Sequence, residues 1–311
     1  MRVIVTGAGG FVGRHTCKAL IASGHDVVRL DRALMPAPAS ESIEGDLCDP
    51  AIVTRAFAGG CDAVVRLATV PGGAAELDPL SAWRTNVDTS MLLTEAAARA
   101  GTCPKFLFAS SIAVFGAPLP PEGVDDDTPL APRLLYGAHK AMIESWIATL
   151  TRRGEIDGLS LRLPGIVARP IAPSGMKSAF MSDIFHALRG GMPFVSPVSA
   201  EATMWLMSVD AAAKAFVHAL AAAGPLPGDR AVTLPALRVR MDELATEIAR
   251  QSNARTGLVS YEPDAALETA FGALPPLNAS RATDLGFHHD GSTERLVASA
   301  LATIARTEGQ K

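Results

Sequence analysis

The feature that most constrains this chain is a glycine-rich turn near its first residues. Residues 6–13 read Thr-Gly-Ala-Gly-Gly-Phe-Val-Gly and stand between a short apolar run and an amphipathic segment. In such a strand-turn-helix unit, Gly7 permits the tight turn, Gly10 lets the backbone approach a pyrophosphate, and Gly13 lets the helix pack closely on the strand. The turn therefore predicts a dinucleotide site at the start of an α/β fold.

The start of this predicted helix supplies an anion site. The amides of Phe11 and Val12 lie at the positive end of the helix dipole, where a phosphate binds. Asp31 ends the next strand, about 20 residues after the turn, where a carboxylate binds both ribose hydroxyls and repels a 2′-phosphate. This predicts NAD as the cofactor. Arg32 leaves NADP open, because a neighbouring guanidinium can pair with that phosphate.

A second acidic turn follows in the run Gly45-Asp46-Leu47. Two interpretations of Asp46 stay open. Its carboxylate could reach the adenine amino group of the dinucleotide, or it could only form a turn with the backbone that follows.

The first half of the chain alternates short β-branched runs with longer helical segments. Strands are expected at Val3–Thr6, Val27–Leu30, Ala63–Leu67, Phe106–Ala109 and Leu159–Leu163, and helices at Gly13–Ser23, Ser81–Arg99 and Tyr136–Arg152. This alternation is typical of a parallel sheet covered on both faces. We therefore expect an α/β fold with a doubly wound parallel sheet.

The character of the sequence changes after residue 163, where prolines interrupt the alternation. We expect residues 1–165 to form a dinucleotide-binding domain, to which about 203–235 return through a strand at Ala231–Leu234. Residues 166–202 and 236–311 then form a smaller mixed α/β substrate lobe. This lobe includes a helix at Met241–Gln251 with acidic residues in its first turn.

Composition limits the possible partners. With 48% hydrophobic residues, 19% charged residues and a net charge of −4, the chain has no basic excess to neutralise a nucleic acid, which favours a small-molecule substrate. No apolar run reaches the roughly 20 residues of a membrane span, so no membrane role is expected. The four cysteines lack the spacing of a zinc site or disulfide framework, which points to the reducing cytoplasm.

A tyrosine and a lysine carry the candidate chemistry. Tyr136 and Lys140 are four residues apart and therefore share one face of the predicted helix. A tyrosine, whose ordinary pKa is about 10, acts as an acid or base near neutrality only if that pKa falls. The Lys140 ammonium would lower it and could also hold the nicotinamide ribose. By itself the spacing is more typical of an ordinary exposed pair.

The segment upstream favours the catalytic interpretation. The buried run Phe106–Ala109 is followed by Ser110 and Ser111, at the carboxyl edge of the sheet where ligands bind. Ser111 is expected to hydrogen-bond the substrate oxygen and to orient it toward Tyr136. Ser110 is expected to cap backbone groups at the strand end.

Taken together, the chain resembles the extended short-chain dehydrogenase/reductase superfamily over essentially its whole length. The resemblance is carried by the glycine turn, Asp31, Asp46-Leu47, Leu67-Ala68, Asn86, Ser111, and Tyr136 with Lys140. It implies that Ser111 and Tyr136 form the hydrogen-bonding pair and proton relay and that Lys140 anchors the ribose. Around NAD it places Leu47, Leu67, Ala68, Asn86, Pro164 and Ile166.

The resemblance also implies architecture and assembly. Members of the superfamily have a seven-stranded sheet. They often form homodimers in which the helices near Ser81–Arg99 and Tyr136–Arg152 build a four-helix bundle.

Departures from the superfamily narrow the reaction. Ile112 and Ala113 stand where sugar-nucleotide dehydratases carry an acidic pair, and the asparagine usual in nucleotide-sugar epimerases is absent near Pro164. Three segments, Gly158–Pro170, Tyr261–Asp264 and Asn278–Phe287, resemble enzymes that oxidise a four-carbon sugar acid at C2. A nucleotide-sugar 4-epimerase that retains its NAD stays open as the alternative.

A sugar acid requires a cation for its carboxylate, which a guanidinium binds through two hydrogen bonds. Arg169 is the first candidate, with Lys177 or Ser174 as alternatives, whereas Arg162 lies within a strand and is expected to be structural. The loop that begins at Thr69 is expected to line the pocket floor. No metal is expected, because the histidines lack the spacing of a ligand set.

Overall fold

The computed structural model describes residues 1–36, 40–100, 103–116, 118–171, 177–222, 226, 228–255 and 257–308. The chain divides into two compact units. The first unit comprises Met1–Gly116, Pro129–Leu163 and Ala213–Thr233, and the second comprises Ala117–Thr128, Pro164–Ala212 and Leu234–Lys311.

The first unit is built on a seven-stranded, wholly parallel sheet. Its strands are β1 (Arg2–Thr6), β2 (Asp26–Asp31), β3 (Glu41–Glu44), β4 (Ala63–Arg66), β5 (Lys105–Ser111), β6 (Asp157–Leu163) and β10 (Ala231–Thr233). They lie in the order β10-β6-β5-β4-β1-β2-β3. The strand order reverses between β1 and β4, where open α/β sheets bind ligands beyond the carboxyl ends of the strands. The predicted doubly wound sheet is confirmed.

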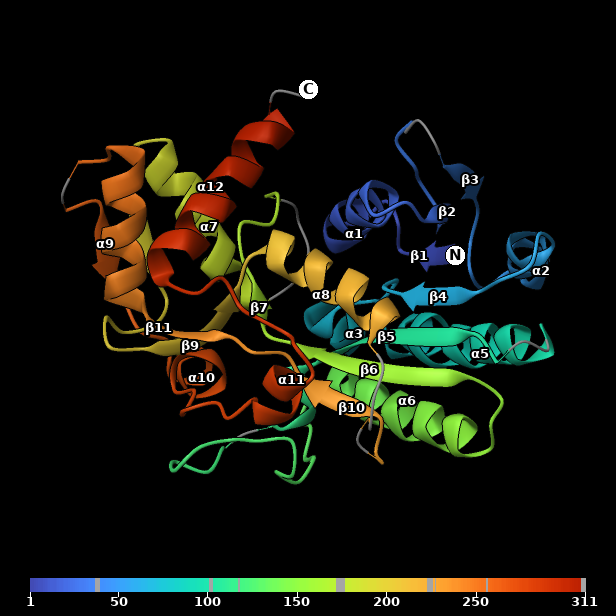
Figure 1. Cartoon of the computed structure of the whole chain (residues 1–311). Helices are drawn as coiled ribbons and strands as arrows, with labels where there is room; N and C mark the ends of the chain where they lie inside the picture. Colours follow the sequence, from blue (N-terminus) through green and yellow to red (C-terminus); the bar gives the residue numbers. More distant parts are fainter. Residues whose placement is uncertain are drawn as a thin grey trace. The chain divides into compact units, whose positions relative to one another are not determined.

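Helices cover both faces of this sheet. Those of the first unit are α1 (Phe11–Ala22), α2 (Pro50–Phe57), α3 (Gly72–Leu77), α4 (Pro79–Trp83), α5 (Thr89–Arg99), α6 (Leu135–Arg152) and α8 (Val209–Ala221), the last counted here from residue 213 onward. Apolar side chains of α2, α5 and α6 form one buried cluster with the strands. Figure 1 shows α1 and α8 on one side of the strands and α5 and α6 on the other.

Two elements of the first unit differ from the sequence expectation. The helix expected over Ser81–Arg99 is interrupted by a π-helical turn, η1 (Arg84–Asp88), whose Thr85 carbonyl accepts a hydrogen bond from Arg66 Nη2 at 2.6 Å. Strand β3 was not expected. Its residues are mostly polar, because it is the edge of the sheet and buries only Ile43.

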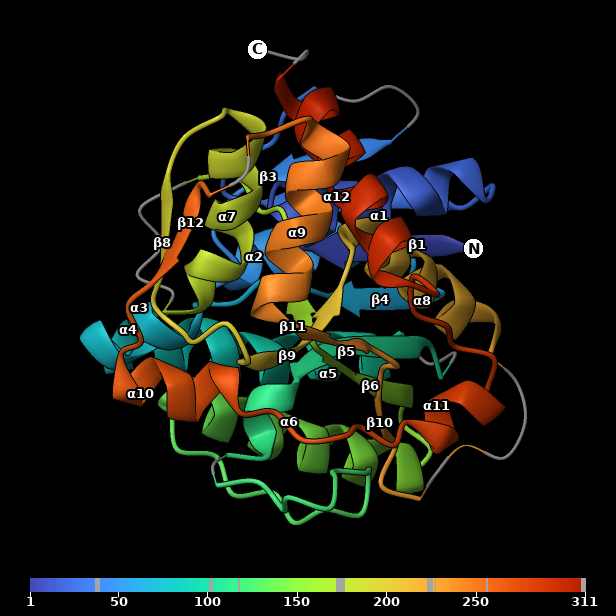
Figure 2. The same ribbon diagram turned by 90° about the vertical axis from the view of Figure 1, so that its left-hand side faces the viewer.

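The second unit contains two small sheets. One has three strands, β7 (Gly165–Ile166), β9 (Thr203–Met207) and β11 (Leu237–Arg240), in the order β11-β9-β7, and the other pairs β8 (Phe194–Ser196) with β12 (Val259–Tyr261). Its helical elements are η3 (Lys177–Ala179), α7 (Phe180–Arg189), α9 (Met241–Ser252), α10 (Ala265–Leu267), η4 (Glu268–Gly272), α11 (Ser280–Asp284) and α12 (Thr293–Glu308). Helices α7, α9 and α12 lie side by side and share an apolar core with the three-stranded sheet (Figure 2). This is the predicted mixed α/β lobe.

The segment 203–235 is divided differently from the sequence expectation. Strand β10 does join the large sheet, beside β6. Strand β9 instead pairs with β7 and β11, because its apolar residues are buried in the core of the second unit. The return to the first unit thus begins at Ala213, and residues 117–128 group with the second unit.

Candidate active site

The glycine turn is fixed by close backbone contacts. Gly7 has a φ of +71°, and a Cβ there would lie 2.5 Å from the amide nitrogen of Ala68. A Cβ at Gly13 would lie 1.9 Å from the Gly7 carbonyl oxygen. Any side chain at either position would push the turn away from α1 or from the loop after β4. Glycine at these two positions therefore brings the ends of β1 and β4 together.

Helix α1 begins at this turn without a side-chain cap. Gly10 precedes it with extended backbone and donates its N–H to the Gly7 carbonyl at 3.0 Å, and no side chain of the described residues caps the helix. The first amides of an α-helix lack intrahelical acceptors. The amides of Phe11 and Val12 are therefore offered to a ligand such as a pyrophosphate.

Asp31, at the end of β2, lies against the same turn. Its Oδ2 accepts a hydrogen bond from the amide of Gly9 at 2.9 Å, and its Oδ1 accepts one from the amide of Arg32 at 2.7 Å. Each carboxylate oxygen has capacity for a further hydrogen bond. Two ribose hydroxyls could thus be bound at a position that also repels a phosphate.

Asp46 forms a turn with the backbone that follows it, which is one of the two roles that the sequence left open. Its Oδ1 accepts a hydrogen bond from the amide of Cys48 at 2.9 Å, and the residue is exposed. Leu47 beside it is buried in the core of the first unit. This turn does not decide whether Asp46 also contacts an adenine amino group, so the cofactor role of Asp46 stays a prediction.

Lys140 is buried beside Tyr136 on α6. Only 3% of its surface is exposed, and its Nζ donates to the carbonyl of Ala109 at 2.7 Å. The same Nζ lies 4.6 Å from the centroid of the Phe108 ring and 5.3 Å from that of the half-buried Tyr136 ring. Burial and the charge of Arg66 hold the pKa of Lys140 well below its ordinary value, and Glu144 acts in the opposite direction.

Tight packing brings the end of β5 against the start of α6. A Cβ at Gly137 would lie 2.3 Å from the carbonyl oxygen of Ala113, in the 3-10 turn η2 (Ile112–Val114). Ser111 precedes this turn, and its Oγ accepts a hydrogen bond from the Ala113 amide at 3.2 Å. The predicted pair Ser111 and Tyr136 therefore lies on two segments that pack directly on one another.

The segment after β4 also lies close to the start of α6. A Cβ at Gly72 would lie 3.9 Å from the Cβ of Tyr136. The loop is held by the buried Asn86, whose Oδ1 accepts from the amide of Val70 at 2.7 Å and from Thr69 Oγ1 at 3.0 Å, and whose Nδ2 donates to the Val70 carbonyl at 3.0 Å. Asn86 thus positions the loop, and its predicted place around the cofactor stays a prediction.

The hydrogen-bond partners of several polar groups near the site were not predicted from the sequence. Ser110 does not cap the strand end as expected, because its hydroxyl donates to Glu144, whose carboxylate also binds Arg162 in a buried ion pair at 2.8 Å. His139 is buried, 3.4 Å from Asn86 Nδ2, and burial and Lys140 lower its pKa. A local sequence pattern cannot pair residues this far apart along the chain.

The remaining predicted residues belong to the second unit. Pro164 and Ile166 are buried. Arg169 is half-buried, donates from Nε to the Ile166 carbonyl at 3.1 Å, and follows Ala168, whose φ is +58°. Lys177 is exposed at the start of η3, and Ser174 lies outside the described residues.

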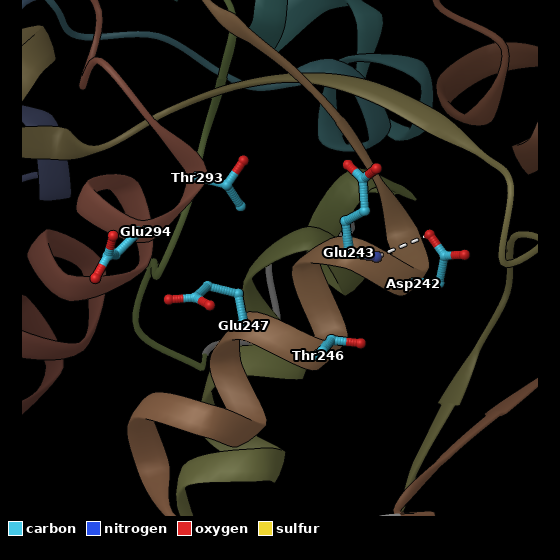
Figure 3. A pocket seen from close by; sticks show the side chains of 6 residues that line it. All are labelled: Asp242, Glu243, Thr246, Glu247, Thr293 and Glu294. Carbon is cyan, nitrogen blue, oxygen red and sulfur yellow. Dashed lines mark hydrogen bonds between the residues drawn. The ribbon is translucent and has the colours of Figure 1, made fainter.

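A hollow in the second unit is lined by side chains at the start of α9 and α12 (Figure 3). Its residues are Asp242, Glu243, Thr246, Glu247, Thr293 and Glu294. Four carboxylates make the hollow acidic, although Arg240 and Arg250 pair with members of the set. Repulsion between like charges disfavours both a dinucleotide and a sugar acid there.

Two further surveys cover the part of the chain that the structure describes. Among these residues, no group of three or more histidine, cysteine, aspartate or glutamate side chains is arranged to hold a metal ion. None of the described helices combines the length and the apolar character needed to cross a membrane.

Comparison with known proteins decides the family. Residues 3–232 match the NAD dependent epimerase/dehydratase family. The chain belongs to this family. Membership confirms the extended short-chain dehydrogenase/reductase type predicted from the sequence, and with it NAD as the cofactor and an oxidoreductase chemistry at a CH–OH group.

Relatives within the family align over almost the whole chain. D-erythronate dehydrogenase from Cupriavidus necator is 36% identical, covering 96% of this chain and 97% of the relative. D-erythronate dehydrogenase from Haemophilus influenzae is 29% identical, covering 96% and 98%. Among solved structures, a nucleoside-diphosphate-sugar epimerase from Agrobacterium tumefaciens has a TM-score of 0.86 at 29% identity, covering 96% of this chain and 92% of that one.

The position of Asp31 leads to a prediction about cofactor choice. Asp31→Asn keeps the shape of the side chain but removes the charge that repels a 2′-phosphate, and Arg32 is exposed next to it. We expect the ratio of NADP⁺ to NAD⁺ affinity to rise at least about tenfold, measured by calorimetric titration. Asp26→Asn, at the other end of the same strand, is the matched control. An unchanged ratio would show that Asp31 does not face the ribose.

Proposed function

We propose that this chain is an NAD-dependent dehydrogenase that oxidises the C2 hydroxyl of a small sugar acid such as D-erythronate, through Ser111, Tyr136 and Lys140. The observation that carries the proposal is the burial of the Lys140 ammonium 5.3 Å from the Tyr136 ring, on a helix that packs against the end of β5. The two D-erythronate dehydrogenases that align over almost the whole chain support the choice of substrate.

The residues present suit the proton transfer of this reaction. Ser111 would hydrogen-bond the substrate hydroxyl and hold it toward the phenol of Tyr136. Tyr136 would accept the hydroxyl proton as the C–H bond breaks, and the Lys140 ammonium would stabilise the phenolate that carries out this step. NAD, when bound on the amides of Phe11 and Val12, supplies the hydride acceptor.

The role of Tyr136 gives a direct test. In Tyr136→Phe the proton acceptor is lost while the ring remains, so kcat for reduction of NAD⁺ with D-erythronate should fall by about 10²- to 10⁴-fold. Affinity for NAD⁺ should change by less than about threefold, because a single neutral hydrogen bond is at stake.

Tyr261→Phe is the matched control, because Tyr136 and Tyr261 are the two tyrosines of the chain. It should leave kcat unchanged. Turnover of Tyr136→Phe near that of the wild type would refute the proton-relay role.

Nucleotide-sugar 4-epimerisation is the second candidate, favoured by the similarity to the epimerase from Agrobacterium tumefaciens. It would use the same three residues with NAD retained through the cycle. The two reactions differ in their stoichiometry. An epimerase would purify with bound NAD and show no net NADH formation, whereas a dehydrogenase accumulates NADH in step with sugar acid consumed.

Arg169 is proposed to bind the substrate carboxylate. The guanidinium is half-buried and is held by the Ile166 carbonyl, and the unusual left-handed backbone of Ala168 directs the chain just before it. Strained backbone of this kind is often retained where a side chain must be aimed. Thr69 and Lys177 are proposed as further contacts, from the loop after β4 and from η3 respectively.

The Arg169 proposal predicts a selective effect on substrate. Arg169→Leu should raise the KM for D-erythronate by about 10- to 100-fold, the value of a lost charged hydrogen bond, and leave the KM for NAD⁺ nearly unchanged. Arg250→Leu, an exposed arginine of α9 in the same unit, is the control. An equal rise in both KM values would indicate a general distortion and count against carboxylate binding.

We also propose that the protein works in the cytoplasm, where its four free cysteines stay reduced.

A further proposal is that the chain forms a homodimer through the outer faces of α4, α5 and α6. Large apolar side chains are exposed on these helices and on α3, namely Leu77, Leu80, Trp83, Met91, Leu135, Met142 and Trp146. The spacing of Leu135, Met142 and Trp146 places them in one stripe along α6. Exposed apolar stripes of this kind mark protein interfaces.

The dimer proposal is tested by placing a charge in the stripe. Met142→Glu should convert the dimer to a monomer, measured by light scattering after size-exclusion chromatography, because burying a carboxylate in an apolar interface costs several kcal/mol. Met192→Glu, at an exposed methionine of the second unit, should leave the mass unchanged. A wild-type chain that is monomeric at tens of micromolar would disprove the proposal.

A further inference from the structure

A buried arginine of the first unit has no counter-ion among the residues that the structure describes. Arg66, the last residue of β4, is 1% exposed. Its Nε donates to Ser90 Oγ at 3.2 Å, and its Nη2 donates to the Thr85 carbonyl at 2.6 Å and to Thr89 Oγ1 at 2.9 Å. Within the described residues, Nη1 is buried with no hydrogen-bond partner and no carboxylate forms a salt bridge with Arg66. Burying a guanidinium without an anionic partner costs desolvation free energy. A residue that is kept in this state is a candidate for a functional role.

Arg66 lies beside the catalytic lysine. Strands β4 and β5 pair in parallel with Arg66 opposite Phe108, so these two side chains project from the same face of the sheet. The Lys140 Nζ lies 4.6 Å from the Phe108 ring centroid and donates to the carbonyl of the next residue, Ala109. The guanidinium and the ammonium therefore flank Phe108.

Other charged groups also surround this pair. From α3, the Glu76 carboxylate accepts a hydrogen bond from the Leu135 amide at 2.8 Å and acts on His139. From α6, Glu144 faces Lys140 but is bound to Arg162 of β6, and His139 is kept neutral by burial, which lowers its pKa. The Cys48 thiol also faces Arg66, but burial and Asp46 raise its pKa, so it stays neutral. The phenol of Tyr136 is a group on which both cations can act, since Arg66 and Tyr136 interact electrostatically and Lys140 Nζ lies 5.3 Å from the Tyr136 ring.

The two cations differ in how well they keep their protons. Burial lowers the pKa of Arg66 to about 10, which still leaves it charged near neutrality. Burial and Arg66 together hold the pKa of Lys140 well below its ordinary value. The charge of Lys140 is therefore the one that can be lost as pH rises, while that of Arg66 persists.

We propose that Arg66 is a positioning residue of the active site, a second cation, charged near neutrality, that stabilises the phenolate form of Tyr136 together with Lys140. The inference deepens the proposed function and rests on it for the role of Tyr136. It assigns no contact between Arg66 and substrate. The alternative is that Arg66 only fixes the π turn η1 and the start of α5 through Thr85, Thr89 and Ser90.

The phenol can be observed directly, independently of turnover. The chain has two tyrosines, so protein labelled with ¹³Cζ-tyrosine gives two resonances, which Tyr136→Phe assigns. Tyr261 serves as an internal reference whose pKa is raised by burial. The titration of Tyr136 is then followed with and without NAD⁺ in the wild type, Lys140→Met, Arg66→Met and the double variant.

Removal of both cations should have the decisive effect. Because each cation can partly compensate for the other, each single variant should raise the midpoint pH of the Tyr136 titration only modestly. The double variant should raise it by about one further pH unit beyond Lys140→Met, as expected for a charge several ångströms away at an effective dielectric constant near 20. Arg66→Lys in the Lys140→Met background keeps a positive charge. Its Tyr136 midpoint should therefore stay close to that of Lys140→Met alone.

Two results would overturn the inference. One is a double variant whose Tyr136 titration coincides with that of Lys140→Met alone. The other is an equal shift in Ser90→Ala combined with Lys140→Met, which loosens the contacts of Arg66 but keeps its charge. If Arg66→Met does not fold, the Lys140→Met variant alone provides the test. The midpoint pH of its Tyr136 titration should still lie below that of free N-acetyltyrosinamide, and a midpoint at or above that reference contradicts the inference.

These outcomes separate the inference from the proposed function. An active Tyr136→Phe with a shifted titration in the double variant would remove the catalytic role of Tyr136 but leave the second cation. An inactive Tyr136→Phe without a shifted titration in the double variant would support the catalytic role of Tyr136 and remove the second cation.

Discussion

The burial of the Lys140 ammonium is the interaction on which the rest of the site depends. An ammonium removed from water requires compensation, which the Ala109 carbonyl and the rings of Phe108 and Tyr136 provide. This arrangement requires β5 to end where α6 begins, and the absence of a side chain at Gly137 lets the two segments approach that closely. The geometry of the phenol is therefore set by backbone packing.

Much of this could be predicted because it depends on local patterns. The glycine turn predicts its own close contacts, since Gly7 and Gly13 meet backbone atoms that leave no room for a Cβ. The spacing of Tyr136 and Lys140 places them on one helix face. The seven-stranded sheet followed from the resemblance, and the family to which the chain belongs is consistent with all three.

What the sequence did not predict depends on contacts between distant segments. Asn86 holds a loop that ends more than a dozen residues earlier, and Glu144 binds Arg162 on a different strand, so no local spacing reveals either. Arg66 reads as part of an ordinary apolar strand, and its partners lie in a π turn that a helical pattern cannot predict. Strand β9 was not predicted, and its apolar residues do not show which of the two cores buries them.

A crystal structure of the chain with NAD⁺ bound tests the central claim most directly, namely that Tyr136, whose phenolate is stabilised by the buried Lys140 ammonium, meets the substrate hydroxyl beside the nicotinamide. We expect the pyrophosphate on the amides of Phe11 and Val12. The nicotinamide C4 should lie where a substrate carbon can be held about 3–3.5 Å away while the hydroxyl on that carbon reaches the Tyr136 oxygen. A nicotinamide ring bound away from Tyr136, or a pyrophosphate that does not contact the glycine turn, would contradict it.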